Sequence, residues 1–132
     1  MASIQALIIE DTAINSDVLC EMLRGEGLTC VVLQDARMIQ RYMAEQTPPD
    51  LIFLDLEMPY IDGYEVLDIL KNQAGWETVP VVACTVHTGE ANTARSKPFH
   101  SFLSKPLDAD HFSEQLKEIL DGKRVWDVSR MA

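Results

Sequence analysis

The chain contains few cysteines, and their placement excludes two kinds of cross-linked protein. Cys20, Cys30 and Cys84 are odd in number, and none of them stands in a C-x-x-C spacing. This argues against a disulfide framework and against a zinc knuckle. We therefore expect all three to be small, buried apolar residues of a protein in a reducing compartment.

Long apolar runs and an excess of basic residues are also missing. No apolar run approaches the roughly 20 residues that span a bilayer, and "MASIQALIIED" has no basic region and too short an apolar stretch for a signal peptide. With 21 acidic and 11 basic residues, the net charge of -10 argues against direct binding to nucleic acid or to an anionic membrane. A cytoplasmic protein that binds cations or basic partner surfaces is expected.

Five short apolar runs indicate a parallel sheet. A chain of 132 residues with 47% hydrophobic and 24% charged residues has the size and composition of one folded domain. The apolarity in the runs is continuous and not alternating, which is typical of parallel strands covered on both faces. The expected strands cover residues 4–9, 29–34, 51–54, 79–85 and 100–104.

Segments with helical spacing lie between these runs. The first carries an apolar stripe and is followed by Gly25 and Gly27, which can end a helix. Segment 88–101 has few large apolar residues, so its helix should be short. The alternation predicts a (βα)5 fold with helices on both faces of the sheet. The expected first stripe consists of Ile14, Val18, Leu19, Met22 and Leu23, and the other helices centre on residues 38–43, 64–70 and 112–120.

Acidic residues follow two of the predicted strands. Glu10 and Asp11 come after the first strand, and Asp55 ends the third. Ligands of open parallel sheets bind at the carboxyl ends of strands, and neighbouring strands lie roughly 4.8 Å apart. If the first and third strands are neighbours, the three carboxylates lie in one small pocket, where they would repel one another unless a cation were present. Mg2+ suits such a site, because it binds one or two carboxylates together with waters and a phosphate oxygen.

Four motifs in this order resemble those of the receiver domain of bacterial two-component response regulators. They are the acid pair at 10–11, the D-x-x-M-P-x-x-D-G pattern from Asp55 to Gly63, Thr85 after the fourth strand, and Lys105-Pro106 after the fifth. The resemblance covers the chain from residue 4 to about 122. It implies a flavodoxin-like (βα)5 three-layer sandwich with strand order 2-1-3-4-5, a receiver domain over residues 1–122, and a C-terminal tail over 123–132.

The resemblance implies a phosphoacceptor and a metal site. Asp55 would take a phosphoryl group from a sensor histidine kinase or phosphotransfer protein and become an aspartyl phosphate. Mg2+ would be held by Asp11, Asp55 and the backbone carbonyl of Glu57, with Glu10 acting through water. Metal and positioned charge would then stabilise the transferred group. The chain would be a single-domain response regulator that signals by protein contacts, not an enzyme.

The resemblance also implies a switch. Lys105 and Thr85 would contact phosphoryl oxygens, and Phe102 would fill the space that Thr85 leaves when it moves. Phe102 is equally an ordinary core residue. The output surface for an unknown downstream protein, and for a possible homodimer, would be formed by the fourth helix, fifth strand and fifth helix. Val125 and Trp126 of the tail either dock on the domain or begin another segment.

Some of these residues also have ordinary structural roles, and the sequence departs from the family pattern at three places. The acid pair can cap the helix that follows it, and Asp62-Gly63 can serve a turn and a cap. Glu57 adds negative charge at the mouth of the site, and His87 can titrate near neutral pH there. The stretch from Thr85 to Lys105 is about two residues shorter than the common family spacing. Before the fifth strand, where the family usually has Ala-Gly, this sequence has Lys-Pro-Phe at 97–99. The shape of the fourth helix is therefore not predicted.

Two rival functions remain. The first is an adaptor with a receiver fold that works unphosphorylated, against which the complete set of site residues argues. The second is a metal-dependent phosphohydrolase, which usually needs a second acid two residues beyond its nucleophile, where Glu57 stands. The chain has no room for the cap that would cover a hydrolase substrate. Pro106 permits a cis peptide bond with Lys105, which the receiver resemblance implies.

Overall fold

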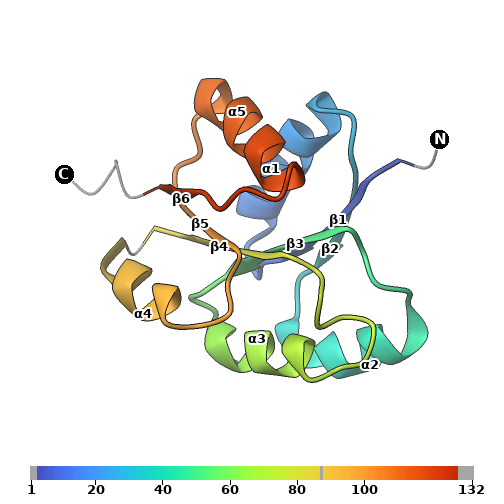
Figure 1. Ribbon diagram of the computed structural model, residues 1–132. Coiled ribbons are helices and arrows are strands. Elements are labelled where there is room, and N and C mark those ends of the chain that lie inside the picture. The colour runs from blue at the N-terminus through green and yellow to red at the C-terminus, as the bar shows by residue number, and fades with distance from the viewer. Residues whose placement is uncertain (1–2, 87, 128–132) are drawn as a thin grey trace.

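Strands and helices alternate through the chain as predicted. The computed structural model describes residues 3–86 and 88–127, and Figure 1 shows its ribbon. Two short 3-10 turns, Ala36–Met38 and Thr88–Glu90, precede the second and fourth helices. The elements in chain order are β1 (Gln5–Ile9), α1 (Ala13–Gly25), β2 (Thr29–Leu33), α2 (Ile39–Glu45), β3 (Leu51–Asp55), α3 (Gly63–Lys71), β4 (Val81–Thr85), α4 (Ala91–Arg95), β5 (Ser101–Ser104), α5 (Ala109–Leu120) and β6 (Trp126–Asp127).

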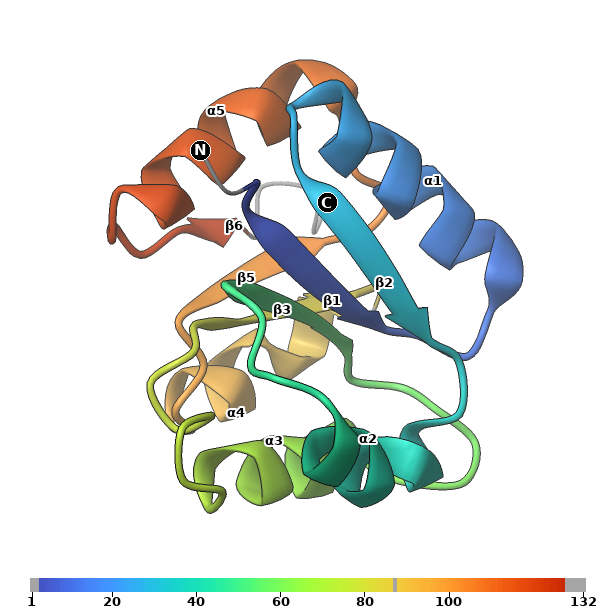
Figure 2. The same cartoon turned by 90° about the vertical axis from the view of Figure 1, so that its right-hand side faces the viewer.

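All strands of the sheet are parallel. Within the described residues their order is β2-β1-β3-β4-β5-β6. Helices α1 and α5 cover one face, while α2, α3 and α4 cover the other (Figures 1 and 2). The flavodoxin-like three-layer fold and the 2-1-3-4-5 order are thus confirmed. The tail adds a sixth strand beyond β5.

The strands are apolar along their whole length because helices cover both faces of the sheet. All five residues of β3 and all five of β4 are buried. Side chains alternate across a strand, so Ile52 and Leu54 face the α2–α3–α4 layer, while Leu51 and Phe53 face the α1–α5 layer. Two apolar cores result, one on each side of the sheet. Both end at the carboxyl edge where the polar residues begin.

The predicted apolar stripe of the first helix is only partly buried. Leu19 and Leu23 pack in the core, but the side chains of Ile14 and Val18 are 74% and 52% exposed. The predicted helix is confirmed, and only part of its apolar stripe packs in the core. Helical spacing shows which residues share one face of a helix, but neighbouring elements decide how much of that face is buried. The first turns of α1 leave this face in solvent beside the end of β1.

The fourth helix is short, as expected from its composition. It spans five residues and buries Ala91 and Ala94, which are small. Phe99 lies just beyond it and is almost fully buried. The segment therefore attaches to the sheet through two alanines and one aromatic ring, while longer helices use rows of large apolar residues.

The cysteine prediction is wrong for two of the three residues. Cys20 on α1 and Cys30 on β2 form a disulfide, with their Cα atoms 5.9 Å apart, while Cys84 is free and buried. A tight connection over residues 26–28 returns the chain from α1 to β2, which brings the two side chains together. Their spacing matches no common motif, so the sequence did not reveal the pair. Disulfides are rare in a reducing compartment, so the cysteines no longer support the predicted cytoplasmic location.

The first five residues of the predicted tail lie on the domain. Trp126 pairs with Phe102 and Asp127 with Leu103 in parallel register. Val125 packs against the α1–α5 core. Docking, one of the two alternatives for this segment, is therefore what occurs up to residue 127, and residues 128–132 lie outside the described part. In that part, no helix combines the length and apolarity needed to cross a bilayer.

A close backbone contact makes Gly63 a test of the fold. A Cβ atom at this position would stand 2.8 Å from the carbonyl oxygen of Asp55 and 2.8 Å from Cα of Leu56. We expect Gly63→Ala to lower the free energy of unfolding by about 1–3 kcal/mol in urea denaturation, because the backbone must shift.

Gly25→Ala is the matched control for this substitution. Gly25 lies in a helix, and a Cβ atom added there would meet no atom within 4 Å apart from its chain neighbours and the backbone of its own helix. The same measurement should show unchanged stability or a gain of up to about 1 kcal/mol. Equal losses in the two variants would contradict the close contact at Gly63.

Candidate functional site

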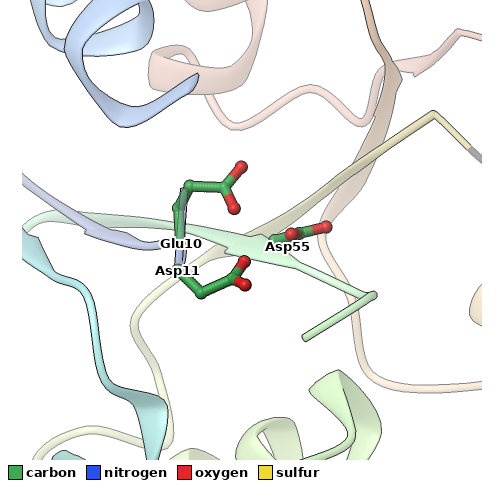
Figure 3. Close-up of side chains that lie close together, drawn as sticks. All are labelled: Glu10, Asp11 and Asp55. Atoms are coloured by element: carbon green, nitrogen blue, oxygen red, sulfur yellow. The ribbon is translucent and has the colours of Figure 1, made fainter. Parts of the chain in front are cut away.

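Three carboxylates meet at the carboxyl ends of β1 and β3. These strands are neighbours with Ile9 opposite Leu54, so the residues that follow them lie side by side. Each of Glu10, Asp11 and Asp55 offers an oxygen within 4.8 Å of the others, and Figure 3 shows the three side chains together. Glu10 is 3% exposed and Asp55 is 8% exposed, while Asp11 opens to solvent. Strand order therefore brings Asp55 next to two acids that precede it by 45 and 44 residues in the sequence.

One ammonium group reaches this cluster from the end of β5. Lys105 Nζ forms an ion pair with Glu10 Oε1 and lies 4.0 Å from Asp55 Oδ1. Its side chain is 15% exposed, so the pair is largely shielded from water. One cation beside three carboxylates leaves an excess of negative charge in the site when all the acids are ionised.

The pKa values of the acids reflect this crowding. Burial, with a further contribution from Glu10, raises the pKa of Asp55 to about 7. Burial and Glu10 also raise the pKa of Asp11. Burial alone would raise the pKa of Glu10, but hydrogen bonds with Asp55 and Lys105 lower it overall. The cluster therefore resists full ionisation, and a divalent cation among its oxygens would favour the charged form of Asp55.

The loop after β3 folds back on Asp55. The backbone N–H of Glu57 donates a hydrogen bond to Asp55 Oδ1 over 3.1 Å. The Glu57 side chain is exposed and borders a separate hollow of the 56–62 loop. Asp62 caps α3 by accepting a hydrogen bond from the Tyr64 N–H over 2.9 Å. Its predicted role in the turn is confirmed, and it is not a member of the acid cluster.

The cap of α1 is Thr12, not either acid of the 10–11 pair. The Thr12 N–H lies 3.4 Å from Glu10 Oε2 and donates a long hydrogen bond to it. Glu10 thus supports the approach to the helix while its other oxygen binds Lys105. The interpretation of Glu10 or Asp11 as the N-cap residue of α1 is therefore wrong.

Thr85 and Phe102 lie on one face of the sheet. Thr85 ends β4 and is fully buried, and its backbone carbonyl accepts a hydrogen bond from the Lys105 N–H over 2.9 Å. Ser104 is its register partner on β5, and Ala83 is opposite Phe102. Paired residues of adjacent strands share a face, so Thr85, Ser104 and Phe102 point the same way. In the described residues, Ser104 Oγ is a buried hydroxyl that makes no hydrogen bond.

A cavity of about 200 Å³ opens beside Asp55, between the start of α1 and the loop after β5. Its wall includes Glu10 and Lys105 as well as Asn15 and Val18, which the sequence did not single out as site residues. Both residues lie in the first two turns of α1, close after the acid pair, and this position could have indicated that they border the site. The Lys105-Pro106 peptide bond is cis, as the resemblance implied. His87 lies outside the described residues.

Comparisons with known proteins agree with this geometry. The sequence matches the family described as response regulator receiver domain over residues 6–117. It is 26% identical over 116 residues to the polar-differentiation response regulator DivK of Brucella ovis, covering 86% of this chain and 94% of that protein. Receiver domains are signalling proteins that interact with histidine kinases or phosphotransfer proteins and with downstream targets.

Solved structures show the same fold. The receiver domain of the sensor histidine kinase PA1611 from Pseudomonas aeruginosa, described with a magnesium ion coordinated in its active site cleft, aligns with a TM-score of 0.80. Its identity is 24%, and the alignment covers 91% of this chain and 99% of that one. The signal receiver domain of a histidine kinase from Syntrophus aciditrophicus aligns with a TM-score of 0.78 and 28% identity, covering 97% and 94%. The match over most of the sequence, on a sheet that gathers the acids and lysine at one edge, shows that the chain belongs to the response regulator receiver domain family.

Proposed function

We propose that Asp55 accepts a phosphoryl group from a phosphohistidine of a sensor histidine kinase or phosphotransfer protein. The adduct then changes the contacts of this chain with a downstream protein. The observation that carries the proposal is the meeting of Glu10, Asp11 and Asp55 with Lys105 at one edge of the sheet. The domain that does this would span residues 1–122.

The transfer is a displacement at phosphorus. A carboxylate oxygen of Asp55 attacks the phosphorus atom, and the bond from phosphorus to the imidazole nitrogen breaks, with its electron pair staying on the nitrogen. Lys105 exchanges part of its contact with Glu10 for a phosphoryl oxygen, and the Thr85 hydroxyl donates to another. Both groups position and neutralise charge, which is the main task of proteins in phosphoryl transfer.

The donor set suits Mg2+. The acid cluster consists of oxygen ligands with excess negative charge and one solvent-exposed member, Asp11, at its open side. Asp11, Asp55 and the backbone carbonyl of Glu57 would hold the ion, and Glu10 would act through water. The ion supplies neutralisation of the carboxylates and of the phosphoryl oxygens. The magnesium described in the cleft of the PA1611 receiver domain supports this assignment.

The surface around the cavity fits a protein donor. Ile14 and Val18 are exposed apolar residues on the first turns of α1, and Val18 also lines the cavity beside Asp55. Exposed apolar groups next to a functional site are typical of protein contacts. The imidazole of a donor helix would enter between α1 and the loop after β5. The acidic net charge of the chain favours a donor with a basic rim.

Two alternatives are separated from this proposal by chemistry. A phosphorylation-independent adaptor has no need of a shielded ion pair beside an acid cluster. A phosphohydrolase would use the acid two residues beyond its nucleophile, but Glu57 is exposed and borders a different hollow from the one beside Asp55. The receiver function therefore explains more of the site.

Phosphorylation by a small donor tests the proposed function. With acetyl phosphate and MgCl2, the intact mass should rise by one phosphoryl group, because the Asp55 carboxylate displaces acetate from phosphorus. Asp55→Asn should gain none. Asp62→Asn, an acid of the same loop that caps α3, should still gain one. Absence of an adduct on the natural chain would favour the adaptor, and repeated turnover of phosphate esters would favour the hydrolase.

Magnesium should stabilise the fold through the acid cluster. In thermal unfolding at neutral pH, MgCl2 at ten times its dissociation constant should add about 1.4 kcal/mol, because the ion binds the native state. Asp11→Asn should lose most of this gain. Asp17→Asn, an exposed acid on α1 outside the cluster, should keep it. Equal gains in the two variants would contradict the assigned site.

A further inference from the structure

The outer edge of β5 is closed by the chain's own C-terminal segment. We name residues 124–127 the C-terminal strap. The Phe102 N–H donates to the Val125 carbonyl over 2.9 Å, and the Val125 N–H donates to Ser101 Oγ over 2.9 Å. Figure 1 shows this strand, β6, lying along β5. The strap therefore satisfies backbone groups that an edge strand would otherwise present to solvent or to another chain.

Trp126 ties the strap to α4 and β5. Its ring stacks on Phe102 with the centroids 5.4 Å apart and an interplanar angle of 27°. The Arg95 guanidinium, from the last turn of α4, lies 4.9 Å from the centroid of the same indole ring. The indole thus bridges a helix of five residues to the buried aromatic of the neighbouring strand. Stacked and cation–π contacts of this kind stabilise a docked aromatic ring.

The strap also contacts α5. Asp127 Oδ2 accepts a hydrogen bond from Gln115 Nε2 over 2.7 Å, on the side of the sheet opposite to Trp126. At the start of the strap, Arg124 Nη1 lies 3.5 Å from the Phe99 carbonyl oxygen and donates to it. Together the contacts of the strap reach α4, β5 and α5. They occupy the surface that the sequence resemblance had assigned to output.

Phe102 connects this surface with the site. It is fully buried and lies on the same face of the sheet as Thr85 and Ser104. Close-packed interiors pass displacements to neighbouring side chains, since there is little free volume to absorb them. Ser104 lies between the site and Phe102 on this face, and within the described residues its Oγ has no hydrogen bond to hold it. Thr85, Ser104 and Phe102 thus offer a route of buried side chains along one face of β4 and β5.

We propose that the C-terminal strap closes the α4–β5–α5 face in the unphosphorylated protein and that phosphorylation of Asp55 releases it through Thr85 and Phe102. The inference rests on the proposed function, because the phosphoryl group is the trigger. As the Thr85 hydroxyl moves to a phosphoryl oxygen, Phe102 moves into the space on the shared face and its ring separates from Trp126. The weakened strap then leaves the β5 edge.

Release exposes a surface for a protein partner. The edge of β5 presents unpaired backbone N–H and C=O groups, and the Arg95 guanidinium loses its aromatic cover. An extended segment of a downstream protein that carries an aromatic residue can take the place of the strap. A homodimer through the same face also requires the strap to leave first.

Nuclear magnetic resonance tests the release on the full chain. The protein has two tryptophans, whose indole N–H signals are distinguished with Trp126→Phe. With acetyl phosphate and MgCl2, the Trp126 signal should move to the position typical of a solvated indole. The Phe102 amide, which donates to Val125, should exchange at least about tenfold faster. Trp76, buried beside Tyr42, should stay unchanged, as should every signal in Asp55→Asn.

Coupling can be measured from the opposite direction. By linkage, if a phosphoryl mimic weakens docking of the strap by some factor, the docked strap weakens binding of the mimic by that same factor. Trp126→Ala should therefore lower the half-saturating concentration of beryllium trifluoride, with MgCl2 present, by about two- to tenfold. Trp126→Phe keeps a stacking ring and should behave as the natural chain does.

The outcomes separate the two proposals when intact mass is recorded on the same sample. An adduct with unchanged Trp126 and Phe102 signals overturns the strap inference and leaves the proposed function standing. Equal beryllium trifluoride affinities in Trp126→Ala and Trp126→Phe also overturn it. A sample without any adduct contradicts the proposed function, and the trigger of the strap with it.

Discussion

Two carboxylates, Glu10 and Asp55, are buried within reach of one ammonium group, Lys105, at the point where three different strands end. Buried charges are costly unless they are paired, so this contact requires β1, β3 and β5 to end at the same level of the sheet. The parallel order β1-β3-β4-β5 meets that requirement. The exposed carboxylate of Asp11 then completes a set of oxygens on the solvent side. The acid cluster therefore depends on strand order more than on any single loop.

The same strand order places the site close to a surface that other proteins can reach. β4 lies between β3 and β5, so Thr85 stands between Asp55 and the Phe102 strand. A change at the acid cluster has a short route through buried side chains to the edge of the sheet. In this chain that edge is covered by Trp126, held between the aromatic ring of β5 and the cation of α4. Helix α4 itself buries two alanines, and Phe99 just beyond it adds one buried aromatic ring.

Local signals predicted most of the fold, and the order of the motifs together with the family resemblance predicted the site. Five apolar runs identified the main strands, and helical spacing identified α3 and α5. What these patterns missed depends on how elements meet after folding. Ile14 and Val18 are exposed, because an apolar stripe shows which side chains share a helix face but not how far neighbouring elements cover that face. The disulfide between Cys20 and Cys30 depends on how α1 lies against β2, and Asn15 joins a cavity wall that several elements form.

Sequence patterns were enough to predict the parallel α/β class, the alternation of strands and helices, and the residues that stand at the strand ends. These are encoded in local apolar periodicity and in the residues that end each run. Three features arise only when the chain has folded: Lys105 pairs with Glu10, the pKa of Asp55 is raised to about 7, and the tail adds a sixth strand beside β5. Each of these depends on distance, burial and packing between segments remote in the chain, which a linear pattern does not contain.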